Sequence, residues 1–135
     1  MFLLEKELDD YIIDHIDQED DILAELRRET NQKIYHPQML TSHLQGRILE
    51  MICHMIAPRR VLEIGTYTGY ASICMARALV EDSLLYTIEV NDELKYFAGR
   101  YINRAGMSRK IMVLTGDALT IIPGLEEIFD LVYID

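Results

Sequence analysis

The sequence predicts an α/β domain in which helices cover both faces of a doubly wound parallel sheet, preceded by a helical leader. After residue 59, short apolar, β-branched runs alternate with segments of helical spacing. These runs are apolar throughout, which is typical of parallel strands that are buried on both faces. Before residue 58 the apolar residues recur only at helical spacing. We therefore expect a leader over residues 1–57 and a sheet portion over residues 58–135.

Length and composition indicate one globular unit with little affinity for polyanions. The 135 residues suffice for one core, and 50% of them are hydrophobic. Thirteen Lys and Arg against 23 Asp and Glu leave a net charge of −10, which disfavours nucleic acid and anionic lipid as partners. The sequence starts with too short an apolar run for a signal peptide, and no later run reaches membrane-spanning length. We expect a cytoplasmic protein that does not enter the membrane.

The leader is predicted to be helical on both sides of a break at His36 and Pro37. Before the break, apolar residues recur at three- and four-residue steps from Leu3 to Ile16 and again from Ile22 to Leu26. The acidic residues between these runs are expected to form a solvated helix cap rather than a cation site: Asp17, Glu19, Asp20 and Asp21. After the break, a helix from Ser42 ends at Pro58.

Several leader side chains have a structural interpretation that we prefer to a functional one. The apolar face of the helix after Ser42 is expected to pack in the core, Met51 and Met55 included: Leu44, Ile48, Met51, Ile52, Met55 and Ile56. We expect Cys53 and Cys74 to be buried reduced thiols, because neither stands at a metal-ligand spacing. His43 and His54 are expected at the surface or in caps, since no second ligand stands at a recognised spacing.

The sheet portion follows a βαβαβ order. Strands are predicted at residues 61–64, 84–90, 111–114 and 129–134, and helices at residues 70–80 and 92–105, the second closed by Gly106. Because crossovers between parallel strands are right-handed, this order favours a Rossmann-like topology. Ligands of such sheets bind beyond the carboxyl ends of the strands, so the candidate site residues are those at which each strand stops.

The first strand runs into the glycine-rich turn EIGTYTGY, which starts at Glu63. Gly65 allows a tight turn and a close approach of backbone to ligand, and Gly69 allows the following helix to start near it. The GxxxG spacing differs from the GxGxxG of dinucleotide-binding proteins, and the turn lacks the GK[ST] of triphosphate sites. Glu63 suits a cationic or amino-bearing ligand better than a pyrophosphate.

Carboxylates also follow the other strands. Glu89 stands 24 positions after Gly65, where an acidic residue accepts hydrogen bonds from ribose hydroxyls; the alternative, a helix-start carboxylate, is already supplied by Asn91 and Asp92. Asp117 after the third strand caps the next helix, contacts the base of the ligand, or does both. Asp135 follows the fourth strand at the same rim. The sequence thus predicts an adenosine-type ligand.

The segments VLEIGTYTGYA, YTIEVN, GDA and FDLVYID resemble, in this order and at these intervals, the class I S-adenosylmethionine-dependent O-methyltransferases. The similarity is greatest to the small catechol and caffeoyl-coenzyme-A type and its bacterial relatives, and it covers nearly the whole chain. DILAELRRETNQ and MLTSHLQGRILEMI in the leader also resemble that family. The resemblance implies in-line transfer of a methyl group from the sulfonium of the cofactor to a hydroxyl of a small aromatic acceptor.

The resemblance also implies roles for particular residues. Glu63 and Gly65 would hold the methionine part of the cofactor, Tyr67 would lie against it, and Thr41 would offer backbone contacts from the leader. Gly69 and Ala71 of the turn would also belong to the cofactor-binding residues. Ala71 stands where the family often has serine, and Ser72 follows it. Glu89 would bind the ribose diol, and Asp117 with Ala118 would border the adenine.

By the same resemblance, Asp135 is one ligand of a divalent metal, magnesium being the natural ion, and the protein is a homodimer. The family's other metal ligands, its base and its last strands are expected beyond residue 135, so no catalytic residue is assigned here. Three alternatives remain open: an RNA-modifying methyltransferase of the same fold, a nicotinamide-dependent oxidoreductase domain, and a non-catalytic nucleotide-binding module. The GxxxG turn disfavours the oxidoreductase, and the charge of −10 weighs against the RNA enzyme.

Overall fold

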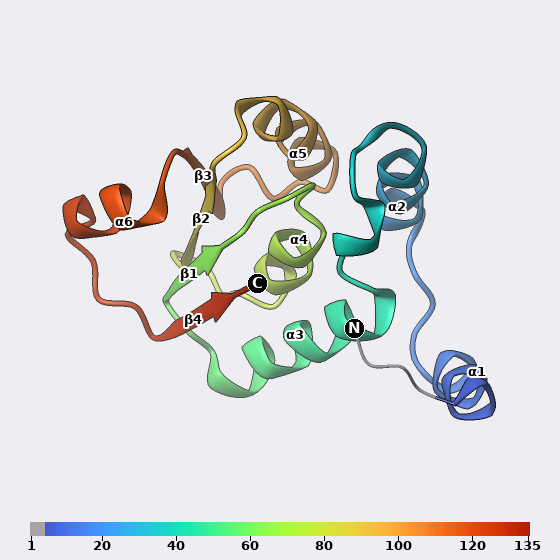
Figure 1. Ribbon diagram of the computed structural model, residues 1–135. Coiled ribbons are helices and arrows are strands. Elements are labelled where there is room, and N and C mark those ends of the chain that lie inside the picture. Colours follow the sequence, from blue (N-terminus) through green and yellow to red (C-terminus); the bar gives the residue numbers. More distant parts are fainter. Residues whose placement is uncertain (1–4) are drawn as a thin grey trace.

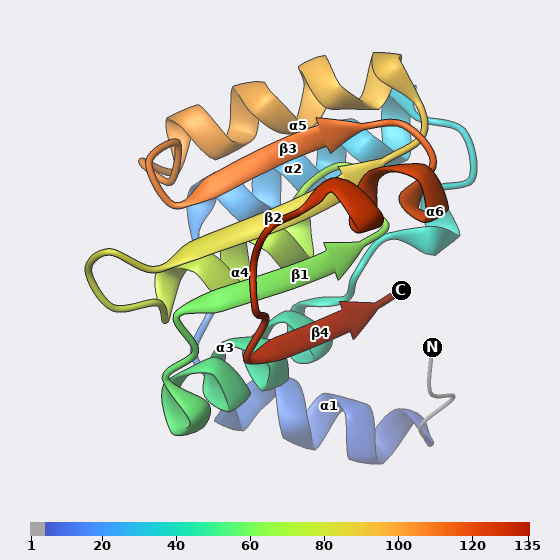
Figure 2. The same cartoon turned by 90° about the vertical axis from the view of Figure 1, so that its left-hand side faces the viewer.

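The computed structural model describes residues 5–135, and its centre is a four-stranded parallel sheet (Figure 2). The strands are β1 (Arg60–Ile64), β2 (Leu84–Glu89), β3 (Ile111–Thr115) and β4 (Leu131–Ile134), in the order β3-β2-β1-β4. This is the strand order of a Rossmann-like sheet, so the predicted fold class is confirmed. In this register Glu63 lies opposite Thr87 on one side and Tyr133 on the other.

Helices cover both faces of the sheet. Helices α4 (Tyr70–Arg77) and α5 (Asp92–Arg104) lie on one face, and α6 (Ala118–Ile121) with the 3-10 turn Ile122–Gly124 lies on the other (Figure 1). The leader forms α1 (Lys6–His15), α2 (Asp21–Lys33), the 3-10 turn Pro37–Met39 and α3 (His43–Ile56). No helix within residues 5–135 is long and apolar enough to cross a membrane.

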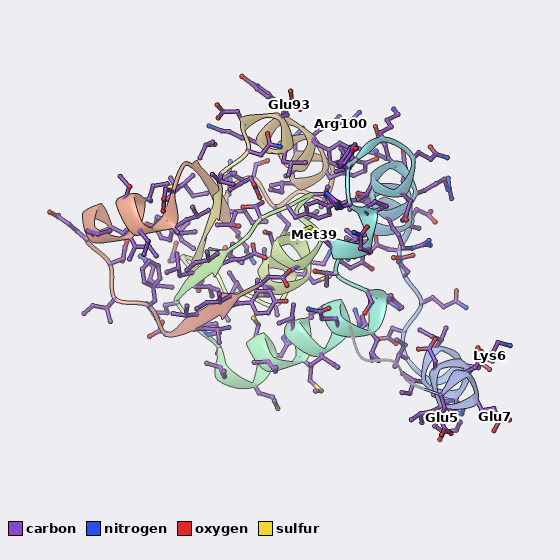
Figure 3. All side chains as sticks on the ribbon, in the orientation of Figure 1. Glu5, Lys6, Glu7, Met39, Glu93 and Arg100 are labelled. Atoms are coloured by element: carbon purple, nitrogen blue, oxygen red, sulfur yellow. The ribbon has the colours of Figure 1, made fainter. Side chains whose placement is uncertain are left out.

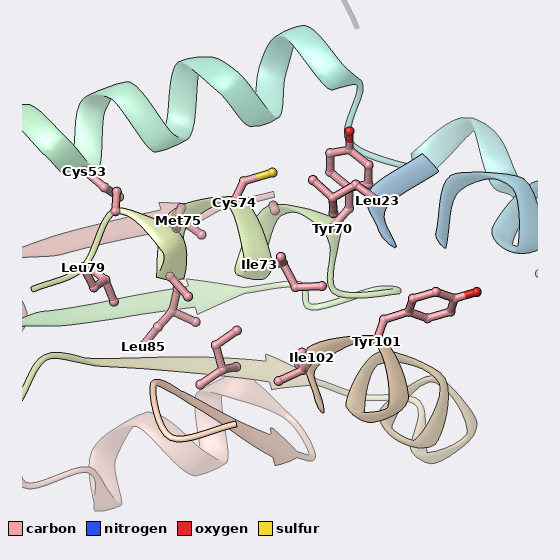
Figure 4. Close-up of a cluster of buried hydrophobic side chains, with 14 of the residues drawn as sticks. Leu23, Cys53, Tyr70, Ile73, Cys74, Met75, Leu79, Leu85, Tyr101 and Ile102 are labelled. Atoms are coloured by element: carbon pink, nitrogen blue, oxygen red, sulfur yellow. The ribbon is translucent and has the colours of Figure 1, made fainter. Parts of the chain in front are cut away.

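The main core lies between the sheet and α4. Every residue from Tyr70 to Ala76 is buried, and Ile73 and Met75 belong with Leu85 of β2 to one cluster of buried side chains (Figure 4). Leu23 and Leu26 of α2 belong to the same cluster. A smaller cluster on the opposite face joins Leu62, Tyr86 and Ile88 to the segment around α6.

Helix α3 packs on α4 through small residues rather than through its predicted apolar face. A Cβ added at Gly46 would lie 2.7 Å from Cys74 Sγ and 2.9 Å from the Tyr70 ring, so the two helices approach closely there. Cys53 and Cys74 are buried and unpaired, as predicted. The residues of the predicted core face that are instead 43–71% exposed are Ile48, Met51, Met55 and Ile56. The core assignment of Met51 and Met55 is therefore wrong, because the sequence pattern did not reveal that glycine and cysteine make the helix contact.

The acidic stretch before α2 is only partly the solvated cap that the sequence predicts. Asp20 caps α2 by accepting hydrogen bonds from the N–H groups of Ile22 and Leu23. The Glu19 side chain, however, is only 12% exposed and accepts from Arg27 and Tyr70. Burial raises the pKa of Glu19, but the hydrogen bonds from Arg27 and Tyr70 outweigh it and leave that pKa below its ordinary value. The solvated interpretation is wrong for Glu19.

Two element boundaries of the sheet portion differ from prediction by more than one residue. Helix α4 ends at Arg77 rather than at residue 80, and β4 begins at Leu131 rather than at residue 129. Leu3 and Leu4, which the sequence places in the first leader helix, lie outside the described residues. Helix α1 has no buried residue, and its charged Glu5, Lys6 and Glu7 project away from the rest of the molecule (Figure 3).

Candidate functional site

A cleft of about 220 Å³ opens at the carboxyl ends of β1, β2 and β3. It brings together residues from the glycine turn, the end of β2 and the loop after β3: Ile64, Gly65, Ile88, Glu89, Val90, Gly116, Asp117 and Ala118. Four of the predicted site residues, Gly65, Glu89, Asp117 and Ala118, thus line one cavity at the rim where Rossmann-like sheets bind ligands.

Gly65 turns the chain away from β1 at a position that disfavours any side chain. Its φ of +103° is a backbone conformation that other residues rarely adopt, and its N–H donates to the Ile88 carbonyl oxygen at 3.0 Å. A Cβ at this position would lie 3.2 Å from the carbonyl oxygen of Asp135. The backbone is therefore the surface that the turn presents to the cleft.

Glu89 is held in place by two backbone donors. The side chain is 7% exposed, its Oε2 accepts from the Tyr67 N–H at 2.8 Å, and its Oε1 accepts from the Asn91 N–H at 3.0 Å. The cap of α5 is Asn91, whose Oδ1 accepts from the Glu93 N–H. Glu89 is thus not the helix cap, and each of its oxygens retains a lone pair for a ligand hydroxyl.

Asp117 has one observed role. Its Oδ1 accepts from the Leu119 N–H at 2.8 Å, which makes it the N-cap of α6. Ala118 is the first residue of that helix. Both residues also line the cleft, so they could contact the base of a bound ligand, and that contact stays a prediction.

The glycine turn is bound to the leader. The Tyr67 hydroxyl donates toward the carbonyl oxygens of Tyr35 at 3.1 Å and His36 at 3.0 Å. Beneath it, the buried Thr30 hydroxyl of α2 donates to Thr68 Oγ1 at 3.2 Å. Thr41, in the same leader segment, is buried but does not line the cleft. Sequence reasoning missed the contacts of Thr30 and Thr68, because no motif marks them.

Glu63 of β1 is a fully buried carboxyl group that adjoins Ile64 of the cleft lining but does not itself line the cleft. Its Oε2 accepts from the Ser72 hydroxyl and from the Thr87 hydroxyl, the latter at 2.6 Å, while its Oε1 has no partner. Burial raises the pKa of Glu63 to about 7; the two hydroxyl groups lower it, and the charges of Asp135 and Glu89 raise it further. Ser72 is thus engaged by Glu63.

Two other predicted residues of the turn serve packing in this structure. Ala71 is 4% exposed within the main core. Gly69 is the N-cap of α4, and a Cβ there would lie 3.3 Å from Ala98 Cβ of α5. Neither residue lines the cleft.

Asp135 lies next to the turn, where its N–H donates to the Ile64 carbonyl oxygen at 3.1 Å and burial raises the pKa of its side chain. Within residues 5–135, no group of three or more His, Cys, Asp or Glu side chains is arranged to hold a metal ion. Magnesium binds through several oxygen ligands, so the described residues by themselves do not fit a magnesium site.

Together, the strand order, the glycine turn and the anchored carboxylate after β2 define a Rossmann-like domain with a cleft at the carboxyl ends of its strands. Comparison with known proteins identifies the family. The family model of the O-methyltransferases matches residues 13–135, so the chain belongs to the O-methyltransferase family.

Similar proteins include two that are named as O-methyltransferases of particular acceptors. A catechol O-methyltransferase from Niastella koreensis is 33% identical over 132 residues, covering 95% of this chain and 59% of the relative. A caffeoyl-CoA O-methyltransferase from Stellaria longipes is 29% identical, with 91% and 52% covered. The chain therefore spans about half to three-fifths of the length of these relatives.

Solved structures of the family share the fold. The O-methyltransferase TomG from Streptomyces achromogenes, in complex with SAM, superposes with a TM-score of 0.88 at 32% identity, covering 96% of this chain and 59% of TomG. An O-methyltransferase from Bacillus cereus, in complex with SAH, gives a TM-score of 0.87 at 30% identity, with 96% and 60% covered.

Proposed function

We propose that residues 5–135 form the S-adenosylmethionine-binding portion of an O-methyltransferase that acts on a hydroxyl group of a small aromatic, catechol-like acceptor. The observation that carries this proposal is the Glu89 carboxylate, fixed by the N–H groups of Tyr67 and Asn91 beside the Gly65 turn. Relatives named for catechol and caffeoyl-CoA support the acceptor class, and TomG and the Bacillus cereus enzyme hold SAM and SAH.

The described residues fit this cofactor. The cleft is lined by apolar groups and two carboxylates, which suits a ligand with a sulfonium and an ammonium group better than a pyrophosphate. Glu89 would bind the ribose hydroxyls, Asp117 and Ala118 would border the adenine, and Gly65 would meet the methionine part. Glu63 adjoins Ile64 of the cleft lining, and an ammonium group that reached its buried Oε1 would supply the donor that this oxygen lacks.

When bound, the cofactor supplies the methyl group as an activated sulfonium. The contribution of this chain is positional: Glu89 and the rigid turn at Gly65 fix the donor so that an acceptor oxygen can approach in line. The metal assistance that the resemblance implies would draw one ligand, Asp135, from this chain. Because the described donor set does not fit a metal, we derive no step through it.

The homodimer that the resemblance implies is also a proposal. The apolar face of α3, formed by Ile48, Met51 and Met55, is exposed, and so are Leu8 and Tyr11 of α1. A second copy covering these faces would bury them. Sedimentation velocity of the wild-type chain should show a dimer. The double variant with Met51→Glu and Met55→Glu should sediment as a monomer. A native chain that sediments as a monomer at high concentration would contradict the proposal.

Ligand binding tests the proposed function directly. S-adenosylhomocysteine should raise the melting temperature of the chain and give a saturable calorimetric isotherm, whereas NADH should do neither. The opposite result would favour an oxidoreductase domain, and failure of both ligands would refute the proposed cofactor.

A further inference from the structure

The Glu63 carboxyl group has donors on one oxygen only. When Glu63 is ionised, Thr87 Oγ1 gives its single hydrogen to Glu63 Oε2, and the Thr66 hydroxyl is then the donor in its 2.6 Å contact with Thr87. Ser72 adds a second donor to the same oxygen. Oε1, on the other side of the carboxyl group, is buried without a partner.

The ionised form of Glu63 is therefore poorly stabilised without ligand. The titratable groups that act on it from neighbouring elements are all acidic: Glu89 on β2, and Tyr133 and Asp135 on or after β4. The contact from α4 is a neutral hydroxyl, that of Ser72. A buried charge that lacks a counter-charge and leaves one oxygen unpaired costs more than the neutral acid, which explains why the pKa of Glu63 rises to about 7.

We propose that Glu63 holds a proton in the ligand-free chain and releases it when the ammonium group of the cofactor is bound, so that cofactor binding is proton-linked. The inference rests on the proposed function. In this step the O–H bond of the carboxyl group breaks and the proton passes to solvent. The carboxylate pairs with the ammonium group, which keeps its own hydrogens, and nothing is oxidised or reduced.

The linkage predicts a definite pH dependence. A group with a pKa of about 7 is about half protonated at pH 7, so binding should release about half a proton there. Release should approach one proton near pH 5.5 and fall toward zero near pH 8.5. The affinity should weaken as the pH falls below 7, by up to tenfold per pH unit.

Calorimetry of S-adenosylhomocysteine binding measures this directly, in pairs of buffers with different ionisation enthalpies and with a chelator present. Glu63→Gln should bind without proton release from this position and with a flat pH profile between pH 5.5 and 7. Thr87→Val keeps the carboxyl group but removes one of its hydrogen-bond donors. The pKa of Glu63 should therefore rise, and the midpoint of proton release should move to a higher pH. Glu126→Gln, which alters an exposed carboxylate, serves as the matched control and should behave as wild type.

The outcomes separate this inference from the proposed function. A chain that binds S-adenosylhomocysteine with no proton release between pH 5.5 and 7 overturns the linkage and leaves the function intact. Equal release by wild type and Thr87→Val across the pH range also overturns it, even if Glu63→Gln fails to fold. 5′-Methylthioadenosine lacks the ammonium group and should bind without release; release with this ligand contradicts the assignment. No binding of any of these ligands refutes the proposed function instead.

Discussion

Replacing Glu89 with glutamine should weaken S-adenosylhomocysteine binding by about 1–3 kcal/mol, roughly 5- to 150-fold in Kd. The carboxylate accepts one hydrogen bond on each oxygen, from Tyr67 and from Asn91. Glutamine keeps one acceptor and turns an amide NH2 toward the other backbone N–H. One backbone donor is then left unpaired, and the ribose loses a charged acceptor.

The same geometry predicts a cost in the free protein. Because Glu89 is nearly buried, an unpaired N–H beside it should lower the free energy of unfolding by about 1–3 kcal/mol. Urea unfolding measures this loss without ligand, and calorimetry measures the affinity. Glu93→Gln, two residues after the cap of α5 and exposed (Figure 3), should change neither quantity by more than about 0.5 kcal/mol.

A ligand pair separates the ribose contact from the effect on the turn. Glu89→Gln should lose less affinity for an S-adenosylhomocysteine analogue without the 2′ and 3′ hydroxyls than for the parent ligand. If the wild-type chain binds both ligands equally well and the variant weakens both to the same extent, Glu89 supports the turn alone and the ribose assignment is refuted.

Three further predictions concern the turn, the leader and the metal. Gly65→Val should abolish S-adenosylhomocysteine binding in calorimetry, because its φ of +103° and the nearby Asp135 carbonyl oxygen exclude a side chain; a folded variant with normal affinity would show that the turn is merely structural. Tyr101→Phe should cost about 1–2 kcal/mol at pH 7, because the Tyr101 hydroxyl is the main cause that lowers the pKa of Glu29 to about 2. That carboxylate stabilises the fold above pH 4.5 and less as the pH falls toward 2, so the variant should lose less stability than wild type between pH 5 and 3, and identical unfolding curves would contradict this. Magnesium should show no saturable calorimetric binding to the 135-residue chain, because Asp135 alone does not supply enough oxygen ligands. Asp135→Asn should change the affinity for S-adenosylhomocysteine by less than tenfold. Tight binding of magnesium to this chain would contradict the prediction that Asp135 needs further ligands.

The elements of the sheet portion could be predicted from local pattern alone. Apolar runs gave β1 and β2 to within one residue, since a central parallel strand has both faces buried and needs no partner to be recognised. Helix α3 was located correctly, but its buried face was not. Which face of a helix is covered depends on what packs there, and the fit of Gly46 against Cys74 is a tertiary fact.

The candidate site divides in the same way. Gly65, Glu89 and Asp117 stand at fixed offsets from strand ends, so sequence reasoning could place them at one rim. The hydroxyl groups that donate to Glu63 could not be predicted from the sequence in this way. Thr87 is its neighbour through the parallel register, a relation that requires knowing which strands pair. The Tyr67 hydroxyl donates to carbonyl oxygens of the leader, a segment far away in the sequence. No local sequence motif marks this contact.

The tyrosine hydroxyl groups of α4 and α5 make the leader inseparable from the sheet portion. The rings of Tyr70 and Tyr101 belong to the main core, while their hydroxyls reach Glu19 and Glu29 of the leader. Removing residues 1–57 would strip two tyrosines of their acceptors and uncover the surface that Leu23 and Leu26 protect. The cleft at the strand ends is thus not a portable module of residues 58–135. In evolution, too, we expect the inner face of the leader to change only together with α4 and α5.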